Sequence, residues 1–285
     1  MFGECHAHMI MDGVNYQKAV ALHRDGVCEA AVRAHLEECR AAGIRFVRDG
    51  GDARGVTCLA KELAAEYGID YRTPVYAIHR KGHYGGIVGR AFSDWDEYEA
   101  LVRGAAEAGA DFIKIMVSGI LDLARAGTLT EPGLDREAIR RMIGTAHDAG
   151  LAVMAHCNGD RTCFDTLEAG VDSLEHGFFM EEETLHLLAE RGTPWMPTFA
   201  PVGNLIGCGR FPDEELGKNL DRQTENVRKA LAYGACVGLG SDAGAYLVPH
   251  GKGTQDEYRY LQRAGADDVV LRRAEDRVRA VFRRR

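Results

Sequence analysis

The sequence contains no apolar run near the roughly 20 residues that a membrane-spanning helix requires. Its first residues show no basic segment followed by a long apolar stretch, so we expect no secretory signal peptide. The sequence also has no excess of positive charge: it contains 43 acidic and 35 basic residues, and its net charge is −8. We therefore expect a cytoplasmic protein whose main partners are neither membranes nor nucleic acids.

Paired cysteines are missing as well. The eight cysteines include no C-x-x-C pair and are scattered along the chain. A disulfide framework is not expected in a chain of 285 residues, whereas reduced, buried thiols fit the cytoplasm.

What the sequence does contain is a regular alternation of short apolar segments and alanine-rich amphipathic segments. The apolar segments predict β-strands at 3–10, 45–50, 71–79, 111–118, 151–157, 173–178, 193–199 and 236–240. The amphipathic segments predict helices that include 29–42, 55–67, 94–108, 135–149, 181–191 and 213–233. Ser93 or Asp94 is expected to cap the third of these helices, with Glu97 completing the cap.

This alternation predicts the α/β class. Several strands, such as FIKIMV, are apolar on both faces, which is typical of parallel strands covered by helices. Eight such strands without a linker favour a single-domain (β/α)8 TIM barrel over residues 1–285, with one C-terminal helix at about 254–285. An open doubly wound sheet is the structural alternative.

Polar residues recur where the predicted strands end. The chain opens with MFGECHAHM, and chance alone readily produces an H-x-H triplet such as His6-Ala-His8 in a chain with 11 histidines. Strands five, six and eight, however, end in His156, His176 and Asp242. In a barrel all these strand ends meet at one mouth, where active sites are built.

Lys114 lies in the middle of the apolar fourth strand, where a buried ammonium is costly. One interpretation is a salt bridge to Asp49 or a similar carboxylate. The other is a lysine of lowered pKa that reacts with CO2 to form a carbamate, an anionic ligand able to bridge two metals.

Together these residues form a convergent ring of nitrogen and oxygen donors. Such a set suits two divalent ions, with zinc as the expected metal. The predicted metal ligands are His6, His8, Lys114, His156, His176 and Asp242.

The ordered set of H-x-H, IKIM, the strand-five histidine, EHG and SDAG resembles the amidohydrolase superfamily. RFVRDGGD and HRKGHYGG are similar to the branch that contains imidazolonepropionase-like proteins and metal-dependent Xaa-Pro dipeptidases. The resemblance implies a binuclear metal centre with a carboxylated Lys114, and Asp242 as both ligand and general base. It implies hydrolysis of an amide bond by a metal-activated hydroxide.

Two features depart from that family. Its members usually carry a small β-sandwich built from segments before the first strand and after the last barrel helix. We expect none here because the H-x-H begins at residue 6 and the chain ends in one charged helix. Some peptidase-like members have a tyrosine two residues after the strand-five histidine, where this chain has Asn158.

The predicted substrate is a small molecule with a carboxylate, such as an N-acyl amino acid or a dipeptide. The loop HRKGHYGG places His79, Arg80 and His83 close together, and arginine can hold a carboxylate by charge-assisted hydrogen bonds. Together with Asn158, these are the predicted substrate-binding residues, although exposed loop residues are an equally good interpretation. A lactone or other cyclic-amide hydrolase, a non-catalytic metal-binding barrel, and assembly into a homo-oligomer all stay open at this point.

Overall fold

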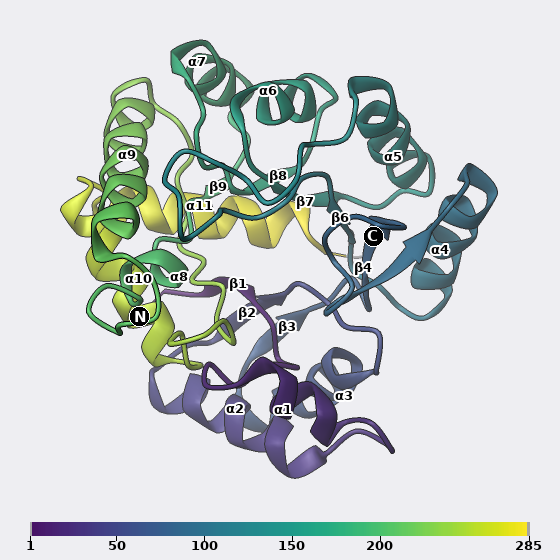
Figure 1. Ribbon diagram of the computed structural model, residues 1–285. Helices are drawn as coiled ribbons and strands as arrows, with labels where there is room; N and C mark the ends of the chain where they lie inside the picture. The colour runs from purple at the N-terminus through teal and green to yellow at the C-terminus, as the bar shows by residue number, and fades with distance from the viewer. Residues whose placement is uncertain (1, 284–285) are drawn as a thin grey trace.

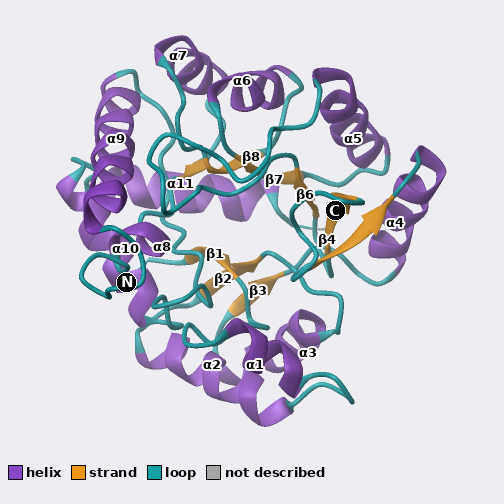
Figure 2. Cartoon of the chain, in the orientation of Figure 1, coloured by secondary structure: helices purple, strands orange, loops and turns teal. Residues whose placement is uncertain are grey.

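The computed structural model describes residues 2–283. Figure 1 shows short strands at the centre of the molecule with helices around them, and Figure 2 shows the same arrangement by secondary structure. The strands are β1 Glu4–Ala7, β2 Phe46–Asp49, β3 Asp70–Arg72, β4 Ala77–Arg80, β5 Gly89–Phe92, β6 Ile113–Met116, β7 Val153–Cys157, β8 Ser173–His176 and β9 Trp195–Met196. The helices are α1 Tyr16–Leu22, α2 Glu29–Ala41, α3 Val56–Leu63, η1 Ala64–Tyr67 (a 3-10 helix), α4 Trp95–Glu107, α5 Arg136–Asp148, α6 Asp160–Glu168, α7 Glu182–Arg191, α8 Ala200–Gly203, α9 Asp213–Ala232, α10 Lys252–Arg263 and α11 Asp268–Val281.

All paired strands run parallel, which confirms the predicted α/β class. They form a three-stranded sheet in the order β1-β2-β3 and a six-stranded sheet in the order β5-β4-β6-β7-β8-β9. Central strands such as β6 and β7 are buried along their whole length, because helices cover their outer face and packed side chains fill the inner one.

The predicted strand at 236–240 is not a regular strand in the structure. Its backbone nevertheless bonds to both sheets: Trp195 N donates to Cys236 O at 2.9 Å, and Cys5 N donates to Leu239 O at 3.0 Å. Gly238 and Gly240 lie in this segment, and a Cβ atom on Gly240 would come within 2.8 Å of His6 Cβ. The segment is thus held between β9 and β1 by close backbone approach.

The predicted strand at 71–79 is wrong as a single element, because the chain breaks it into β3 and β4. Pro74 has no N–H to donate to a ladder, and Val75 adopts a positive φ of 69°. Consequently β3 pairs with β2, whereas β4 pairs with β6 and with the unpredicted strand β5.

The predicted C-terminal helix at 254–285 is two helices, α10 and α11. Gly265, with φ of 99°, ends the first, and the Asp267 side chain accepts hydrogen bonds from the N–H groups of Val269 and Val270 to begin the second. The last two residues of the predicted helix, 284–285, lie outside the described residues.

The cap predicted for the third helix is confirmed in α4. The Asp94 side chain accepts from Glu97 N, and the Ser93 N–H donates to the Glu97 carboxylate at 2.6 Å. Reciprocal bonds of this kind satisfy two backbone donors that the first helical turn cannot pair.

Helix α11 packs against the strands at their amino-terminal side. Its Val278 and the following Phe282 form a buried cluster with residues near the strand beginnings, including Cys5, Phe46 and Met154. The opposite, carboxyl-terminal side is left for the cavity described below. No helix within residues 2–283 combines the length and the hydropathy that crossing a membrane requires.

Candidate metal centre

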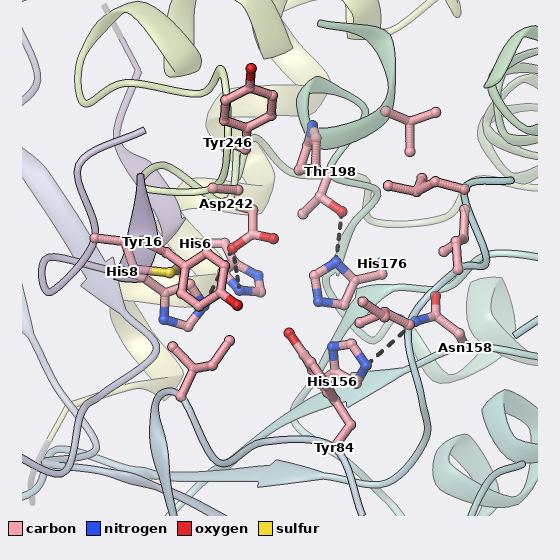
Figure 3. A pocket seen from close by; sticks show the side chains of 18 of the residues that line it. His6, His8, Tyr16, Tyr84, His156, Asn158, His176, Thr198, Asp242 and Tyr246 are labelled. Atoms are coloured by element: carbon pink, nitrogen blue, oxygen red, sulfur yellow. Dashed lines mark hydrogen bonds and ion pairs between the residues drawn. The ribbon is translucent and has the colours of Figure 1, made fainter. Parts of the chain in front are cut away.

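The six predicted metal ligands line a single cavity of about 310 Å³, although they come from separate elements along the chain. Figure 3 labels all of them except Lys114. Five of them are almost completely buried, and the Asp242 side chain is 19% exposed. We call this set the cavity floor: His6, His8, Lys114, His156, His176 and Asp242.

Two histidines and the aspartate approach one another most closely. Asp242 Oδ1 lies 3.3 Å from His8 Nε2 and 3.7 Å from His6 Nε2. One donor atom from each of the three residues lies within 4.8 Å of the other two, a spacing that one metal ion can bridge. Two parallel neighbours position them: His6 lies in β1 and His8 directly after it, and His6 O accepts from Asp242 N at 2.8 Å.

The remaining histidines complete the floor from β7 and β8. The ring centroid of His176 lies 4.5 Å from that of His156 and 5.0 Å from that of His6. His176 Nδ1 is 2.7 Å from Thr198 Oγ1, whose hydroxyl donates to Pro197 O. The Thr198 hydroxyl can then only accept a hydrogen bond from His176. The proton of the His176 ring is therefore on Nδ1, and Nε2 keeps a free lone pair.

The same pattern holds for two more rings. His6 Nδ1 lies 2.7 Å from Glu175 Oε2, and His156 Nε2 lies 3.2 Å from Gly119 O. In each ring one nitrogen therefore donates to a protein oxygen and the other keeps a lone pair. Metal-binding histidines are typically oriented in this way by a carboxylate or a carbonyl.

Electrostatics keeps these imidazoles neutral. Burial, with a contribution from the nearby Lys114, lowers the pKa of His6 to about 4 and that of His156 to about 3. Burial likewise lowers the pKa of His176 well below its usual value. Burial by itself would raise the pKa of Asp242, but the hydrogen bond with His8 contributes to lowering it below its usual value, so the side chain is a carboxylate. Neutral imidazole and ionised carboxylate are the forms that bind divalent metals.

Lys114 makes no salt bridge to any described residue. Its Nζ atom is buried without a hydrogen-bond partner, and burial lowers its pKa to about 8. Asp49, the carboxylate considered as its partner, instead accepts from Met9 N and Gly51 N. The amine is thus an unpaired nitrogen that faces the cavity.

These unpaired atoms test whether a metal fits. His6 Nε2, His8 Nδ1 and Lys114 Nζ have less than 1 Å² of exposed surface and no partner among the described residues. Buried polar atoms normally find a partner, and an unsatisfied one costs about 1–3 kcal/mol. His6 Nε2, 3.7 Å from the Asp242 carboxylate, and Lys114 Nζ, which faces the same cavity, are unpaired nitrogens that fit bound cations.

Beneath the floor lies a buried charged layer. Arg48 Nη2 donates to Glu175 Oε1 at 2.8 Å, its Nε donates to Cys5 O, and its guanidinium lies 4.4 Å from the Phe282 ring centroid. Burial would raise the pKa of Glu175, but Arg48 and His6 lower it to about 2. Glu175 is therefore an anion that fixes His6, and Arg48 balances its charge.

Close packing around the floor requires glycine at one further position. Gly50 follows β2, and a Cβ atom there would overlap the His8 ring. The sequence RFVRDGGD thus supplies both the buried Arg48 and the space for His8.

The predicted substrate-binding residues of β4 and of the loop after it do not line the cavity. His79 is buried with Nδ1 3.1 Å from Arg80 O, and Arg80 itself is exposed. His83 lies 3.7 Å from Glu131. Their role in substrate binding stays a prediction.

Asn158 does line the cavity, but its side-chain amide already forms hydrogen bonds with backbone groups. Its Nδ2 donates to Gly119 O at 3.2 Å, and its Oδ1 accepts from Phe178 N at 3.1 Å. The side chain thereby ties the end of β7 to the loops after β6 and β8.

Sequence reasoning missed the outer part of the cavity. Four of its large aliphatic or aromatic side chains are 37–42% exposed, and one arginine side chain lies among them. We call this set the cavity rim: Tyr16, Ile87, Ile120, Arg210 and Tyr246. They come from connections between strands, where no periodic pattern marks them. Arg48 and Glu175, by contrast, stood in the motifs RFVRDGGD and EHG, as charges within apolar strands.

Comparison with known proteins places this site in context. A Xaa-Pro dipeptidase structure with bound methionine in the active site superposes with a TM-score of 0.71 at 24% identity, over 98% of this chain and 72% of that one. The ochratoxinase structure of Aspergillus niger gives 0.74 at 18% identity, over 98% and 69% of the two chains. At these identities the likeness shows a shared fold.

Sequence comparison gives the family. An uncharacterised protein of Mycobacterium tuberculosis is 30% identical over 178 residues, which are 60% of this chain and 47% of that protein. The chain thus spans about half the length of the curated relatives it matches. The model of the amidohydrolase family matches residues 4–268. The chain belongs to the amidohydrolase family.

Proposed function

We propose that this protein hydrolyses an amide (C–N) bond in a small molecule, such as an N-acyl amino acid or a dipeptide, and that it needs two divalent metal ions, zinc being the expected one. The cavity floor would hold them. The observation that carries the proposal is the convergence of six donor side chains on one cavity, three of which keep a buried nitrogen without a hydrogen-bond partner among the described residues. Family membership supports the same chemistry.

The proposal includes a closed (β/α)8 barrel. Its support is the segment 236–243, which bonds to β9 on one side and to β1 on the other. The predicted division, a single domain over 1–285 without a flanking β-sandwich, stays a prediction.

Lys114 is proposed to carry a carbamate. Its neutral amine would attack CO2, forming an N–C bond and releasing a proton, and the product is an anionic ligand. The support is that the amine has no carboxylate partner and that burial disfavours its charged form. The carbamate would let Lys114 bind both ions, which an ammonium cannot do.

Each remaining residue of the floor has a proposed role. Bound divalent ions would supply Lewis-acid activation of water and of the scissile carbonyl. Asp242 would accept a proton from the attacking water and pass it to the leaving amine, since it is ionised and stands beside His6 and His8. The four histidines would hold the ions.

The rim supports a substrate with a carboxylate and an apolar group. The Arg210 guanidinium lies 4.9 Å from the Tyr246 ring centroid and forms no ion pair among the described residues. It lines the cavity, whereas Arg80 does not, so we propose Arg210 as the cation that holds the carboxylate in competition with the predicted Arg80 and His83. Ile87, Ile120 and Tyr16 would contact the apolar group.

The test is a substrate panel combined with metal analysis. N-acyl amino acids, dipeptides and lactones are assayed with protein loaded with zinc and with protein stripped by a chelator. We expect amide turnover that disappears on stripping and returns with zinc. Best turnover of neutral lactones would instead favour the lactonase or cyclic-amide alternative. Bound zinc without any turnover would favour a non-catalytic metal-binding barrel.

A further inference from the structure

Tyr84 enters the cavity from the loop after β4. Its backbone N–H donates to Glu131 Oε1 at 2.6 Å, which ties this loop to the long connection after β6. The next residue, Gly85, has φ of 134°, and a Cβ atom there would lie 2.7 Å from His79 Cβ. The backbone on both sides of Tyr84 is therefore fixed.

The Tyr84 side chain lies against the cavity floor. Its ring centroid is 5.0 Å from that of His156. Figure 3 shows its hydroxyl pointing into the open space between His8, His156 and His176. That hydroxyl hydrogen bonds to none of the described residues.

Two other polar side chains near this space, those of Asn158 and Thr198, are already engaged. The Asn158 amide donates to Gly119 O, and the Thr198 hydroxyl donates to Pro197 O. Tyr246 lies on the rim, with its hydroxyl pointing away from the histidines in Figure 3. The Tyr84 hydroxyl is thus a neutral hydrogen-bond donor near the cavity floor that has no partner among the described residues.

We propose that Tyr84 is a catalytic residue that donates a hydrogen bond to the oxygen of the scissile carbonyl. This inference rests on the proposed amide hydrolysis. A donor already in place where negative charge develops stabilises the transition state without reorganising. No bond to Tyr84 forms or breaks, and its proton stays on the phenol.

The step also accounts for Asn158. One N–H of the amide is donated to Gly119 O, the amide oxygen accepts from Phe178 N, and Nδ2 lies 3.5 Å from His156 Nε2, so the protein already engages this predicted substrate-binding side chain. Tyr84 offers a hydroxyl at the same cavity from a different loop.

The experiment compares Tyr84→Phe with Tyr67→Phe, a matched control. Tyr67 is also half-buried, but it is the last residue of the 3-10 helix that follows α3, and its hydroxyl accepts from Arg33. Both zinc-loaded variants are assayed for kcat and KM on the best substrate and for bound zinc. Binding of an N-methylphosphonyl amino acid, a mimic of the tetrahedral intermediate, is measured by calorimetry.

We expect Tyr84→Phe to lower kcat about 100-fold with little change in KM, because the lost bond strengthens only in the transition state. Bound zinc should match the wild type, and the phosphonate should bind at least 10-fold more weakly. Tyr67→Phe should resemble the wild type in every measurement.

Unchanged kcat and unchanged phosphonate affinity in Tyr84→Phe would overturn the inference. Loss of zinc would also overturn it, since Tyr84 would then act by packing on His156. If the wild type hydrolyses no amide, the proposed function fails, and phosphonate binding alone decides on Tyr84: weaker binding by the variant supports the inference, and equal binding or none by either protein overturns it.

Discussion

The floor and the rim of the cavity differ in both origin and chemistry. The floor residues lie in or close after the strands and the segment 236–240 and are mostly buried, and a charged layer beneath them holds His6 by a hydrogen bond. The rim residues come from connections and are substantially exposed, and only Arg210 among them is charged. The proposed function assigns the chemistry to the floor and the choice of substrate to the rim.

The largest effect is expected at the floor. Asp242→Asn keeps the shape of the side chain but removes its capacity to accept a proton, so kcat/KM should fall by about 10²–10⁴-fold. Steady-state kinetics on the best amide substrate measure this. Asp148→Asn, an exposed change on α5, serves as the control and should keep full activity. Retained activity in Asp242→Asn would place the base elsewhere.

The layer below the floor should affect stability. Arg48→Met leaves the buried carboxylate of Glu175 without its cation, and breaking a buried pair in this way costs about 3–5 kcal/mol. Urea denaturation of the variant measures the free energy of unfolding. The double variant Arg48→Met/Glu175→Gln should recover much of the loss because no charge is left unpaired. If the single and double variants are equally unstable, charge balance is not the reason for this layer.

A smaller effect is expected on metal binding. Glu175→Gln weakens the acceptor that holds His6 Nδ1, and loss of such partners lowers metal affinity about 10–100-fold. Competition with a fluorescent zinc chelator measures the affinity. The control Glu183→Gln, on the exposed face of α7, should bind zinc as the wild type does. If the wild type, Glu175→Gln and Glu183→Gln bind zinc with equal affinity, Glu175 has no influence on metal binding.

The smallest effect should come from the rim and concerns substrate choice. Arg210→Ala should reduce the preference for an acid over its carboxamide about 10-fold, the loss expected for a charge-assisted hydrogen bond worth roughly 1.5 kcal/mol. Arg80→Ala and His83→Ala should leave this preference unchanged, because neither side chain lines the cavity. If Arg80→Ala or His83→Ala reduces the preference and Arg210→Ala does not, the substrate carboxylate binds at Arg80 and His83 and not at the rim.

The same contrast explains what could be predicted from sequence. The strand-end residues were found because strand and helix periods place them at one edge, whatever the details of packing. Charges inside apolar strands, such as Lys114 and Arg48, stand out because burying them demands a reason.

The other features of the fold and the site depend on interactions that produce no periodic pattern in the sequence. The break at Pro74 and Val75 and the unpredicted strand β5 follow from local backbone geometry and from pairing with β4. Glu131 fixes Tyr84 from 47 residues away, so the loop sequence by itself cannot show which of its side chains enters the cavity. Residues of the rim are likewise brought together only by the folded loops.

The most direct test of the account is the anomalous scattering of zinc in a crystal of the zinc-loaded protein. We predict two zinc ions at the cavity floor, about 3.5–4 Å apart, with His6, His8, His156, His176 and Asp242 as ligands and a carbamate on Lys114 between them. A floor that holds one ion or none, with Lys114 as an unmodified amine, would contradict the account.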